Sequence, residues 1–293
     1  MFDLRYHVAS LVAVFLMLIV GILVGVGISG RGFVDDAERR TFNNRIERLQ
    51  EQVDEAAASA EDLERRQQAA EDFVESAYPV LVDRRLEGKR IAVLVVGSVG
   101  QTLEFVERAL TESGAGFPVR MRAIKVPLPL DEIESTLLTQ AEFGGYVGED
   151  DLGNLGRDLG RELAGGGLTP LWDALSGNLV EERSGVSREP ADGIVVIREA
   201  EPQQGPTSRF LAGVYSGVRS TGAPAVGVEP SRAEQSAIPT FQRHSLSTVD
   251  GIETELGRLA LVLLLGGALP GDYGVRDTAG DGILPPIEPL PTE

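Results

Sequence analysis

The 293-residue chain contains no cysteine, only two histidines and only three methionines. The absence of cysteine excludes a disulfide framework and leaves the redox compartment undetermined. Cu(I) prefers thiolate and thioether ligands, and Cu(II) prefers imidazole. The available residues of these types form no cluster along the sequence: His7, His244, Met1, Met17 and Met121. We therefore expect no metal site within one chain, and the residues themselves predict no cofactor.

Basic residues are also scarce. The chain has 27 Lys and Arg against 45 Asp and Glu, which gives a formal net charge of -18 and a pI near 4.6. Lys89 and Lys125 are its only lysines. Because binding to nucleic-acid phosphates depends on clustered Lys and Arg, this composition argues against a nucleic-acid partner. It equally argues against broad adhesion to anionic lipid.

Charged residues are absent from residues 8–28, which are rich in Leu, Val and Ile. About 20 apolar residues cross a bilayer core, so this run predicts a transmembrane anchor behind a short tail, residues 1–7. A cleaved signal peptide is the alternative, because the small residues Ser29 and Gly30 follow the run. The apolar part of a signal peptide is usually only about 7 to 15 residues long, which favours the anchor.

The charges that flank this run leave the orientation open. Arg5 precedes it, whereas Arg31, Arg39, Arg40 and Arg45 follow it. The positive-inside rule, applied literally, places the bulk of the chain in the cytoplasm. Long domains, however, translocate largely regardless of their charge.

Proline and glycine are absent from residues 35–78. Apolar residues there alternate at spacings of four and three, which predicts a coiled coil. We call the repeated positions the heptad seam; they are Phe42, Ile46, Leu49, Val53, Ala56, Ala60, Leu63, Gln67, Ala70, Val74 and Ala77. Pro79 is expected to stop the helix. The alternative is a single amphipathic helix that lies on the globular domain, because the four alanines make the seam shallow.

Two features bear on helix association. Gln67 at an a position would lower stability but help to fix the register of a coiled coil. Within the apolar run, Gly21, Gly25 and Ser29 form a small-xxx-small face that allows close helix approach. The expected partners are the lipid bilayer and, through the coiled coil, a second copy or the helix of another protein.

Residues 86–270 alternate between short apolar runs and helical patterns. This alternation predicts an α/β fold with a Rossmann-like, doubly wound sheet. The expected strands are 91–96, 119–126, 193–197, 225–228 and 246–249. The expected helices are 101–112, 130–138, 152–163, 169–175, 208–219, 232–237 and 251–265. Residues 259–265 are too few to span a bilayer, so the last helix is interpreted as buried in the core.

Two helix starts carry capping-box spacing, in which an N-cap side chain and the residue three positions later satisfy backbone amides. Ser231 precedes Glu234, and Asp250 precedes Glu253. Residues 271–293 are rich in Gly, Pro and Asp, so we expect this tail to be disordered or extended.

Catalytic motifs are incomplete. Gly97 and Gly100 occupy the first strand-to-helix turn, where a nucleotide-binding enzyme keeps its glycines, but the full fingerprint is absent. His244 lies near Asp250 in sequence, yet no nucleophile motif surrounds a serine. The acidic run 149–151 lacks the spacing of an EF-hand loop. We therefore predict a protein that is not an enzyme.

Several segments resemble the actinobacterial copper-transporter MctB-like family, which also contains the division-associated SteB proteins. The resemblance covers nearly the whole chain in the same order. Its N-terminal part is Leu4-Arg5-Tyr6-His7-Val8-Ala9-Ser10-Leu11-Val12-Ala13-Val14-Phe15-Leu16, followed by Gly21 and Gly25. Its later parts are Leu86-Glu87-Gly88-Lys89-Arg90, Ser247-Thr248-Val249-Asp250, Thr254, Gly257 and Gly271-Asp272-Tyr273-Gly274. Asp272 departs from a histidine that is common in the family.

The resemblance implies an N-terminal anchor, a coiled coil and an α/β envelope domain outside the plasma membrane. It implies either copper transport or a part in septal cell-wall remodelling, and it carries over no catalytic residue. One helix per chain does not line a pore, so transport would need an oligomer or an accessory role. Our first hypothesis is a single-pass, non-enzymatic scaffold or docking partner. A copper-transport component is the second hypothesis, and a nucleotide-binding enzyme is the third.

Overall fold

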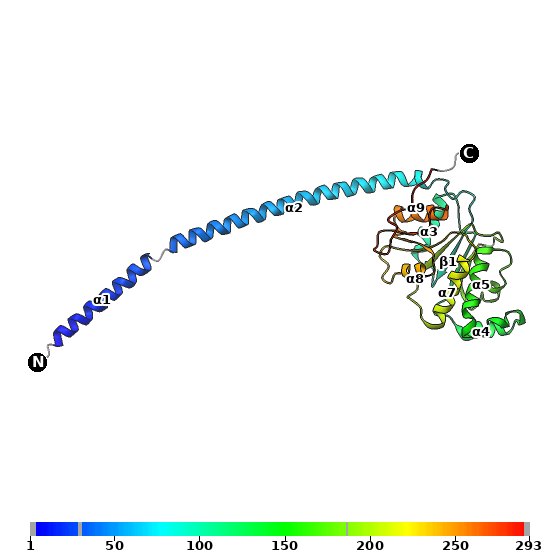
Figure 1. The fold of residues 1–293 in the computed structure, drawn as a ribbon, viewed down its shortest axis with the longest axis horizontal. Helices are drawn as coiled ribbons and strands as arrows, with labels where there is room; N and C mark the ends of the chain where they lie inside the picture. Colours follow the sequence, from blue (N-terminus) through cyan, green and yellow to red (C-terminus); the bar gives the residue numbers. More distant parts are fainter. Residues whose placement is uncertain (1–3, 29–30, 186, 290–293) are drawn as a thin grey trace. The chain divides into compact units, whose positions relative to one another are not determined.

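The computed structural model describes residues 4–28, 31–185 and 187–289. It divides at Ala70 into two compact units. The first unit contains helix α1, Leu4–Ile28, and most of helix α2, Arg31–Val82. The second contains the end of α2 and a mixed α/β domain (Figure 1).

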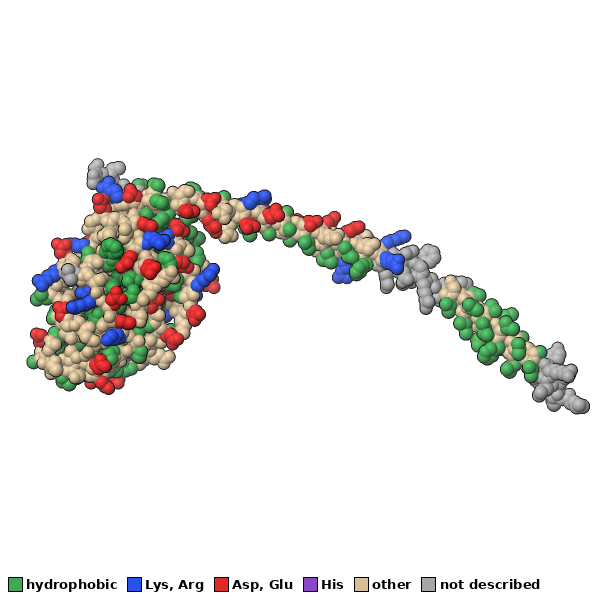
Figure 2. Space-filling view, turned by 180° about the vertical axis from the view of Figure 1, so that it is seen from behind, with side chains coloured by type: hydrophobic (Ala, Val, Ile, Leu, Met, Phe, Trp, Pro, Cys, Tyr) green, Lys and Arg blue, Asp and Glu red, His purple; other side chains and the backbone are tan. Residues whose placement is uncertain are grey.

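Helix α1 is apolar around its whole circumference. The side chains from Val8 to Gly27 are exposed, and apolar atoms cover the visible face of this helix in Figure 2. Among the described helices, only the one over Val8–Gly27 is long and apolar enough to cross a membrane. The predicted apolar helix is therefore confirmed. Of its predicted packing face, Gly21 and Gly25 lie in α1, whereas Ser29 falls outside the described residues.

Helix α2 runs through Pro79 to Val82, so the expected stop at Pro79 is wrong. Proline removes one backbone donor from a helix and crowds the preceding turn. Here Tyr78 and Val82 are buried in the core of the second unit, and the N–H of Asp83 donates to the Pro79 carbonyl at 3.2 Å. Burial of the last turn offsets the lost hydrogen bond.

The domain is built on a seven-stranded sheet of order β3-β2-β1-β4-β5-β6-β7. All neighbouring strands are parallel except β2 and β3, which are antiparallel. The strands are β1 Ile91–Val96, β2 Arg120–Ile124, β3 Val180–Ser184, β4 Gly193–Arg198, β5 Ala225–Glu229, β6 Ser247–Asp250 and β7 Asp272–Tyr273.

Helices cover both faces of this sheet (Figure 1). The α-helices are α3 Gln101–Glu112, α4 Leu130–Leu138, α5 Leu152–Gly165, α6 Pro170–Ala174, α7 Gly205–Arg219, α8 Ile238–Arg243 and α9 Glu255–Leu265. Two 3-10 helices, η1 Ala141–Tyr146 and η2 Glu149–Asp151, precede α5. Successive strand side chains alternate between two cores. One core contains α4 to α8, and the other contains α3, α9 and the end of α2.

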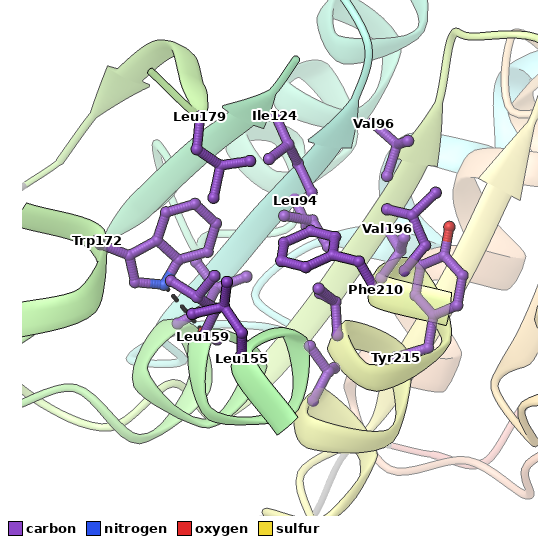
Figure 3. Close-up of a cluster of buried hydrophobic side chains, with 14 of the residues drawn as sticks. Leu94, Val96, Ile124, Leu155, Leu159, Trp172, Leu179, Val196, Phe210 and Tyr215 are labelled. Carbon is purple, nitrogen blue, oxygen red and sulfur yellow. Dashed lines mark hydrogen bonds between the residues drawn. The ribbon is translucent and has the colours of Figure 1, made fainter. Parts of the chain in front are cut away.

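The first of these cores combines aromatic and aliphatic side chains (Figure 3). Phe210 of α7 is fully buried in the same cluster as Leu94 of β1 and Leu155 of α5. The indole Nε1–H of Trp172 donates to the Leu159 carbonyl at 2.9 Å, so its polar atom is satisfied. Tyr215 packs edge to face on Phe241, with ring centroids 5.7 Å apart. These contacts fix the helices on one side of the sheet.

Glycines let α5 and α7 pack closely within this layer. A Cβ placed on Gly156 would lie 3.0 Å from the Val214 amide nitrogen, and one on Gly160 would lie 2.8 Å from that of Val218. Gly213 and Gly217 of α7 meet the backbone of α5 in the same way. Glycine in a helix costs about 1 kcal/mol relative to alanine, and close backbone packing offsets that cost here.

Further elements of the domain differ from those expected. Residues 232–237 form turns, and α8 begins instead at Ile238 with Pro239 in its first turn, where proline is well tolerated. Strands β3 and β7 were not predicted. The tail, expected to be disordered or extended, contains the short strand β7, whose pairing with β6 supplies backbone hydrogen bonds that a Gly-rich and Pro-rich segment otherwise lacks.

Candidate functional site

The strand order reverses direction between β1 and β4, and in parallel sheets ligands bind at the carboxyl ends of strands around such a point. Gly97 and Gly100 follow β1, and Glu199 follows β4. A Cβ on Gly100 would lie 2.8 Å from the carboxyl carbon of Glu199. The chain's own carboxylate therefore occupies the position beside the start of α3 where a nucleotide phosphate would approach. The geometry does not support the nucleotide hypothesis.

His244 and Asp250 have separate structural roles. The His244 ring lies 5.3 Å from the ring of Tyr215, and burial, reinforced by Arg243, lowers the pKa of His244. Asp250 instead accepts hydrogen bonds from the backbone N–H groups of Val275 and Arg276, at 2.8 and 3.2 Å. The described residues thus place the two side chains in different networks and form no triad from them.

The acidic run 149–151 lies in η2 at the protein surface. The Arg209 guanidinium donates to the Glu149 carbonyl at 2.8 Å and lies 3.6 Å from a carboxylate oxygen of Asp150. Asn154 donates to Asp151 at 3.1 Å. No group of three or more His, Cys, Asp or Glu side chains that could hold a metal is found among the described residues. This run is a solvated helix start.

The potential soft ligands are also dispersed. Met17 belongs to the first unit, whereas Met121 is buried in the core of the second. His244 lies in the opposite core layer, against Tyr215. Met1 and the side chain of His7 fall outside what the structure describes. Within the second unit, Met121 and His244 therefore belong to different core layers.

Two segments of the family resemblance, residues 247–250 and 271–274, meet at β6 and β7. Thr248 Oγ1 donates to an Asp272 carboxylate oxygen at 2.7 Å, and the Thr248 N–H donates to the Gly271 carbonyl at 3.0 Å. The Gly271 N–H donates in turn to Ser247 Oγ at 3.3 Å. Gly274 has φ +145, and a Cβ there would overlap the Asp250 carboxylate. Close approach of the two segments therefore requires glycine at this position.

Sequence reasoning missed Glu229, which completes this group of contacts. Glu229 is 2% exposed at the end of β5. Its carboxylate accepts hydrogen bonds from Ser236 Oγ at 2.7 Å, from the Ala237 N–H at 2.6 Å and from the Arg276 guanidinium at 2.7 Å. An acidic residue directly after the apolar run 225–228 was the available signal. We call Glu229, Asp250 and Arg276 the carboxyl-edge network.

The two predicted capping boxes are wrong because no helix begins at Ser231 or Asp250: residues 232–237 form no helix, and α9 begins at Glu255. Glu253 accepts hydrogen bonds from the N–H and the hydroxyl of Ser231, and Asp250 serves the C-terminal segment. Helix α9 is capped by Thr254, whose side chain accepts from the Gly257 N–H at 3.1 Å. A residue of the family resemblance, Thr254, thus has a structural role.

Arg90 before β1 has the same kind of role. Its guanidinium and backbone N–H both donate to Asp192, with contacts of 2.9 to 3.0 Å. The hydrogen bond from the Arg90 guanidinium lowers the pKa of the Asp192 carboxyl, and this effect outweighs burial, which acts in the opposite direction. The pair joins the starts of β1 and β4.

A family model described as "Copper transport outer membrane protein, MctB" matches residues 1–284. The chain belongs to the MctB family. No curated protein matches it. The matched range includes the apolar helix α1, the heptad seam and the carboxyl-edge network, so these features lie within the part of the chain that defines family membership.

In this MctB family member, the heptad seam is an exposed apolar feature outside α1 and the two cores. Large seam side chains are solvent-exposed, with exposed fractions of 64% for Phe42, 53% for Leu49, 65% for Val53 and 67% for Leu63. Acidic and basic side chains lie between the apolar ones along the visible face of α2 (Figure 2). Within the described part of the first unit, no other element covers these side chains.

Proposed function

We propose that the protein is a single-pass, non-enzymatic envelope scaffold, anchored by α1, that pairs with a second copy through the heptad seam of α2. The exposed seam is the observation that carries this proposal. Contiguous apolar surface on a soluble helix marks an interaction site, because water contact with it is unfavourable. The α/β domain would then present a docking surface in cell-wall remodelling at the septum.

The residue types along the seam favour a parallel pair. Spacing assigns Ile46, Val53 and Val74 to a positions, and Leu49 and Leu63 to d positions. β-Branched residues at a with leucine at d favour parallel two-stranded coiled coils. Two copies that share one membrane through α1 also enter α2 from the same end, which supports the parallel arrangement.

Cysteine cross-linking in membranes tests this proposal, because the natural chain contributes no cysteine of its own. We expect Leu63→Cys, at a d position, to form a disulfide-linked dimer under mild oxidation. Equivalent d residues of a parallel pair are neighbours, within the Cα separation that a disulfide needs. Arg65→Cys, two residues away on the outer face, is the matched control.

A dimer specific to Leu63→Cys would support the parallel pair. Equal cross-linking of both variants, or none from either, would refute it. A second readout is the mass of the full chain in neutral detergent. The double variant Leu49→Gln, Leu63→Gln should weaken self-association by at least about 100-fold, given roughly 2 kcal/mol or more for each truncated apolar anchor. Glu51→Gln with Arg65→Gln should leave the mass unchanged.

Family membership favours a second candidate, a component of copper transport. Because the described residues form no soft-ligand cluster, such a role would depend on a partner or on an oligomer. Calorimetry of the full chain with Cu(I) and with Cu(II) tests it, together with the copper sensitivity of a deletion strain. Tight stoichiometric binding, with copper sensitivity on deletion, would favour transport over the scaffold.

The scaffold proposal places the N-terminus inside and the α/β domain outside the plasma membrane, as the family resemblance implies. A reporter that is active only outside the cytoplasm, fused after Glu293, tests this orientation. Activity of the fusion supports an envelope partner. An inactive reporter, with a cytoplasmic reporter active at the same site, would contradict the orientation.

A further inference from the structure

Four arginines line one pocket in a protein of net charge -18. The pocket has a volume of about 260 Å³ and lies beside β2 and β3. Arg120 and Arg122 point to the same side of β2, since they are two residues apart in a strand. Its polar and charged lining includes Arg120, Arg122, Thr169, Asp173, Arg183 and Arg188.

Arg120 forms the inner wall of this pocket and is 1% exposed. Its guanidinium donates to four backbone carbonyls, those of Leu163, Ala164, Ser187 and Glu189, at 2.6 to 3.2 Å. Among the described residues, no carboxylate lies within ion-pair distance of it. Arg120 is therefore hydrogen-bonded, but its charge is not neutralised.

Arg122 is 6% exposed and is incompletely hydrogen-bonded. Its Nη1 donates to the Met121 carbonyl at 2.7 Å and to the Ser184 carbonyl at 3.0 Å. Its Nε–H is buried and has no partner among the described residues. A buried donor without an acceptor costs about 1 to 3 kcal/mol of stability, so a ligand that supplies an acceptor here would stabilise the protein.

Arg122 also faces a like charge. In the ladder between β2 and β3 it lies directly opposite Arg183, an arrangement that destabilises a sheet when nothing separates the charges. Burial lowers the pKa of Arg122, and repulsion from Arg183 lowers it further. Asp173, the one acidic residue lining the pocket, lies 3.3 Å from Arg183 and is largely exposed.

We propose that this arginine pocket binds the phosphoryl group of a small ligand between Arg122 and Arg183. A phosphoryl dianion supplies acceptors for several N–H groups at once, which guanidinium forks bind in bidentate fashion. Its two charges suit a lining of four arginines and one aspartate better than the single charge of a carboxylate does. The volume suits a phosphate or a small phosphorylated molecule rather than a nucleotide.

Titration calorimetry of the full chain in neutral detergent tests the pocket, with inorganic phosphate, a sugar monophosphate and acetate as probes at matched ionic strength. We expect stoichiometric binding of at least one phosphoryl probe, and a raised midpoint of thermal unfolding in its presence. Acetate should bind more weakly. The stronger of the two phosphoryl probes identifies whether free phosphate or a phosphorylated molecule is the better ligand.

Arg183→Gln is the decisive variant, because its side chain is half exposed and is not required for the core. Loss of one charge-assisted partner should weaken phosphoryl binding about 10- to 100-fold. Arg122→Gln should weaken it further if that variant folds. Arg209→Gln, an exposed arginine outside the pocket, should change the affinity less than about twofold.

No phosphoryl binding by the natural chain at millimolar concentration would overturn the proposal. Acetate binding of equal strength would overturn the selectivity for phosphoryl groups, and with it the assigned ligand class. Equal affinities of the natural chain and Arg183→Gln would place the binding elsewhere. None of these outcomes depends on the cross-linking of α2.

Discussion

The two units of this MctB family member treat apolar side chains in opposite ways. In the first, Leu11, Met17 and Leu63 have exposed fractions of 70%, 76% and 67%. In the second, Leu94 and Phe210 are fully buried. The second unit buries two large apolar cores, although Phe117, Leu168 and Leu269 stay exposed, whereas the side chains of Val8–Gly27 in the first unit are all exposed. The contrast supports the proposal that the first unit is the part of the chain that associates.

The largest expected effect comes from charged substitutions in α1, which should prevent the insertion of this helix into a membrane. Val14→Arg combined with Ile19→Arg should abolish stable membrane insertion. Each arginine near the centre of a span costs about 2.5 to 3.5 kcal/mol on insertion scales. Membrane fractionation with alkaline extraction measures the change. Leu63→Arg combined with Val53→Arg on α2 is the control and should leave the membrane fraction intact.

Truncation of a core aromatic should destabilise the domain by nearly as much. Phe210→Ala removes a fully buried ring and should lower the free energy of unfolding by about 3 to 5 kcal/mol. Phe73→Ala, which removes a ring that is 71% exposed on α2, should change it by less than about 0.5 kcal/mol. Denaturant unfolding of the full chain in neutral detergent, followed by domain signals, compares them. Equal losses of unfolding free energy in the two variants would contradict the buried position of Phe210 and the exposed position of Phe73.

A substitution in the carboxyl-edge network should have a smaller effect, which is expected first in residues 271–289. Asp250→Ala leaves the amides of Val275 and Arg276 without their acceptor and should cost about 2 kcal/mol. Hydrogen exchange should speed up in residues 271–289 before it changes in β1 and β4. Asp277→Ala, at an exposed position of the same segment, should leave exchange unchanged. Uniform acceleration throughout the domain would show that the network does not act locally.

The pair Arg90–Asp192 gives the smallest effect, and that effect depends on pH. Because Arg90 lowers the pKa of Asp192 in the folded state, the pair stabilises the protein above the unfolded pKa, near 3.9. That stability is lost as pH falls through the lower folded pKa. Asp192→Asn should cost less than about 1 kcal/mol at neutral pH, because the pair is partly solvated. The difference from the natural chain should shrink as pH falls through the lowered pKa of Asp192.

Much of the domain followed from its apolar pattern. The run Ile91–Val96 predicted β1, and helices α3 and α4 begin and end where their patterns indicated. Strand β3 was missed because its sequence, Val-Glu-Glu-Arg-Ser, carries the charges of an edge strand rather than an apolar run. Strand β7 was missed because its two residues are a strand only through pairing with β6. Local sequence does not record such distant partners.

The candidate sites show the same limit. The residues of the family resemblance were recognised, but their structural roles were not, because Asp250 receives its hydrogen bonds from residues 25 and 26 positions later. The two arginines of β2 alternate with apolar residues, which places them on one face. Only the register with β3 shows that Arg122 lies opposite Arg183.

The contact between Glu229 and Arg276 has a consequence for synthesis. The ribosome makes Glu229 47 residues before its cationic partner, so a nascent chain carries an unneutralised carboxylate at the end of β5 while translation continues. Domains start to fold as they emerge, N-terminal parts first. The native arrangement around β5 and β6 therefore forms only after residues 271–276 have left the exit tunnel, and truncation before them leaves that edge of the sheet unfinished.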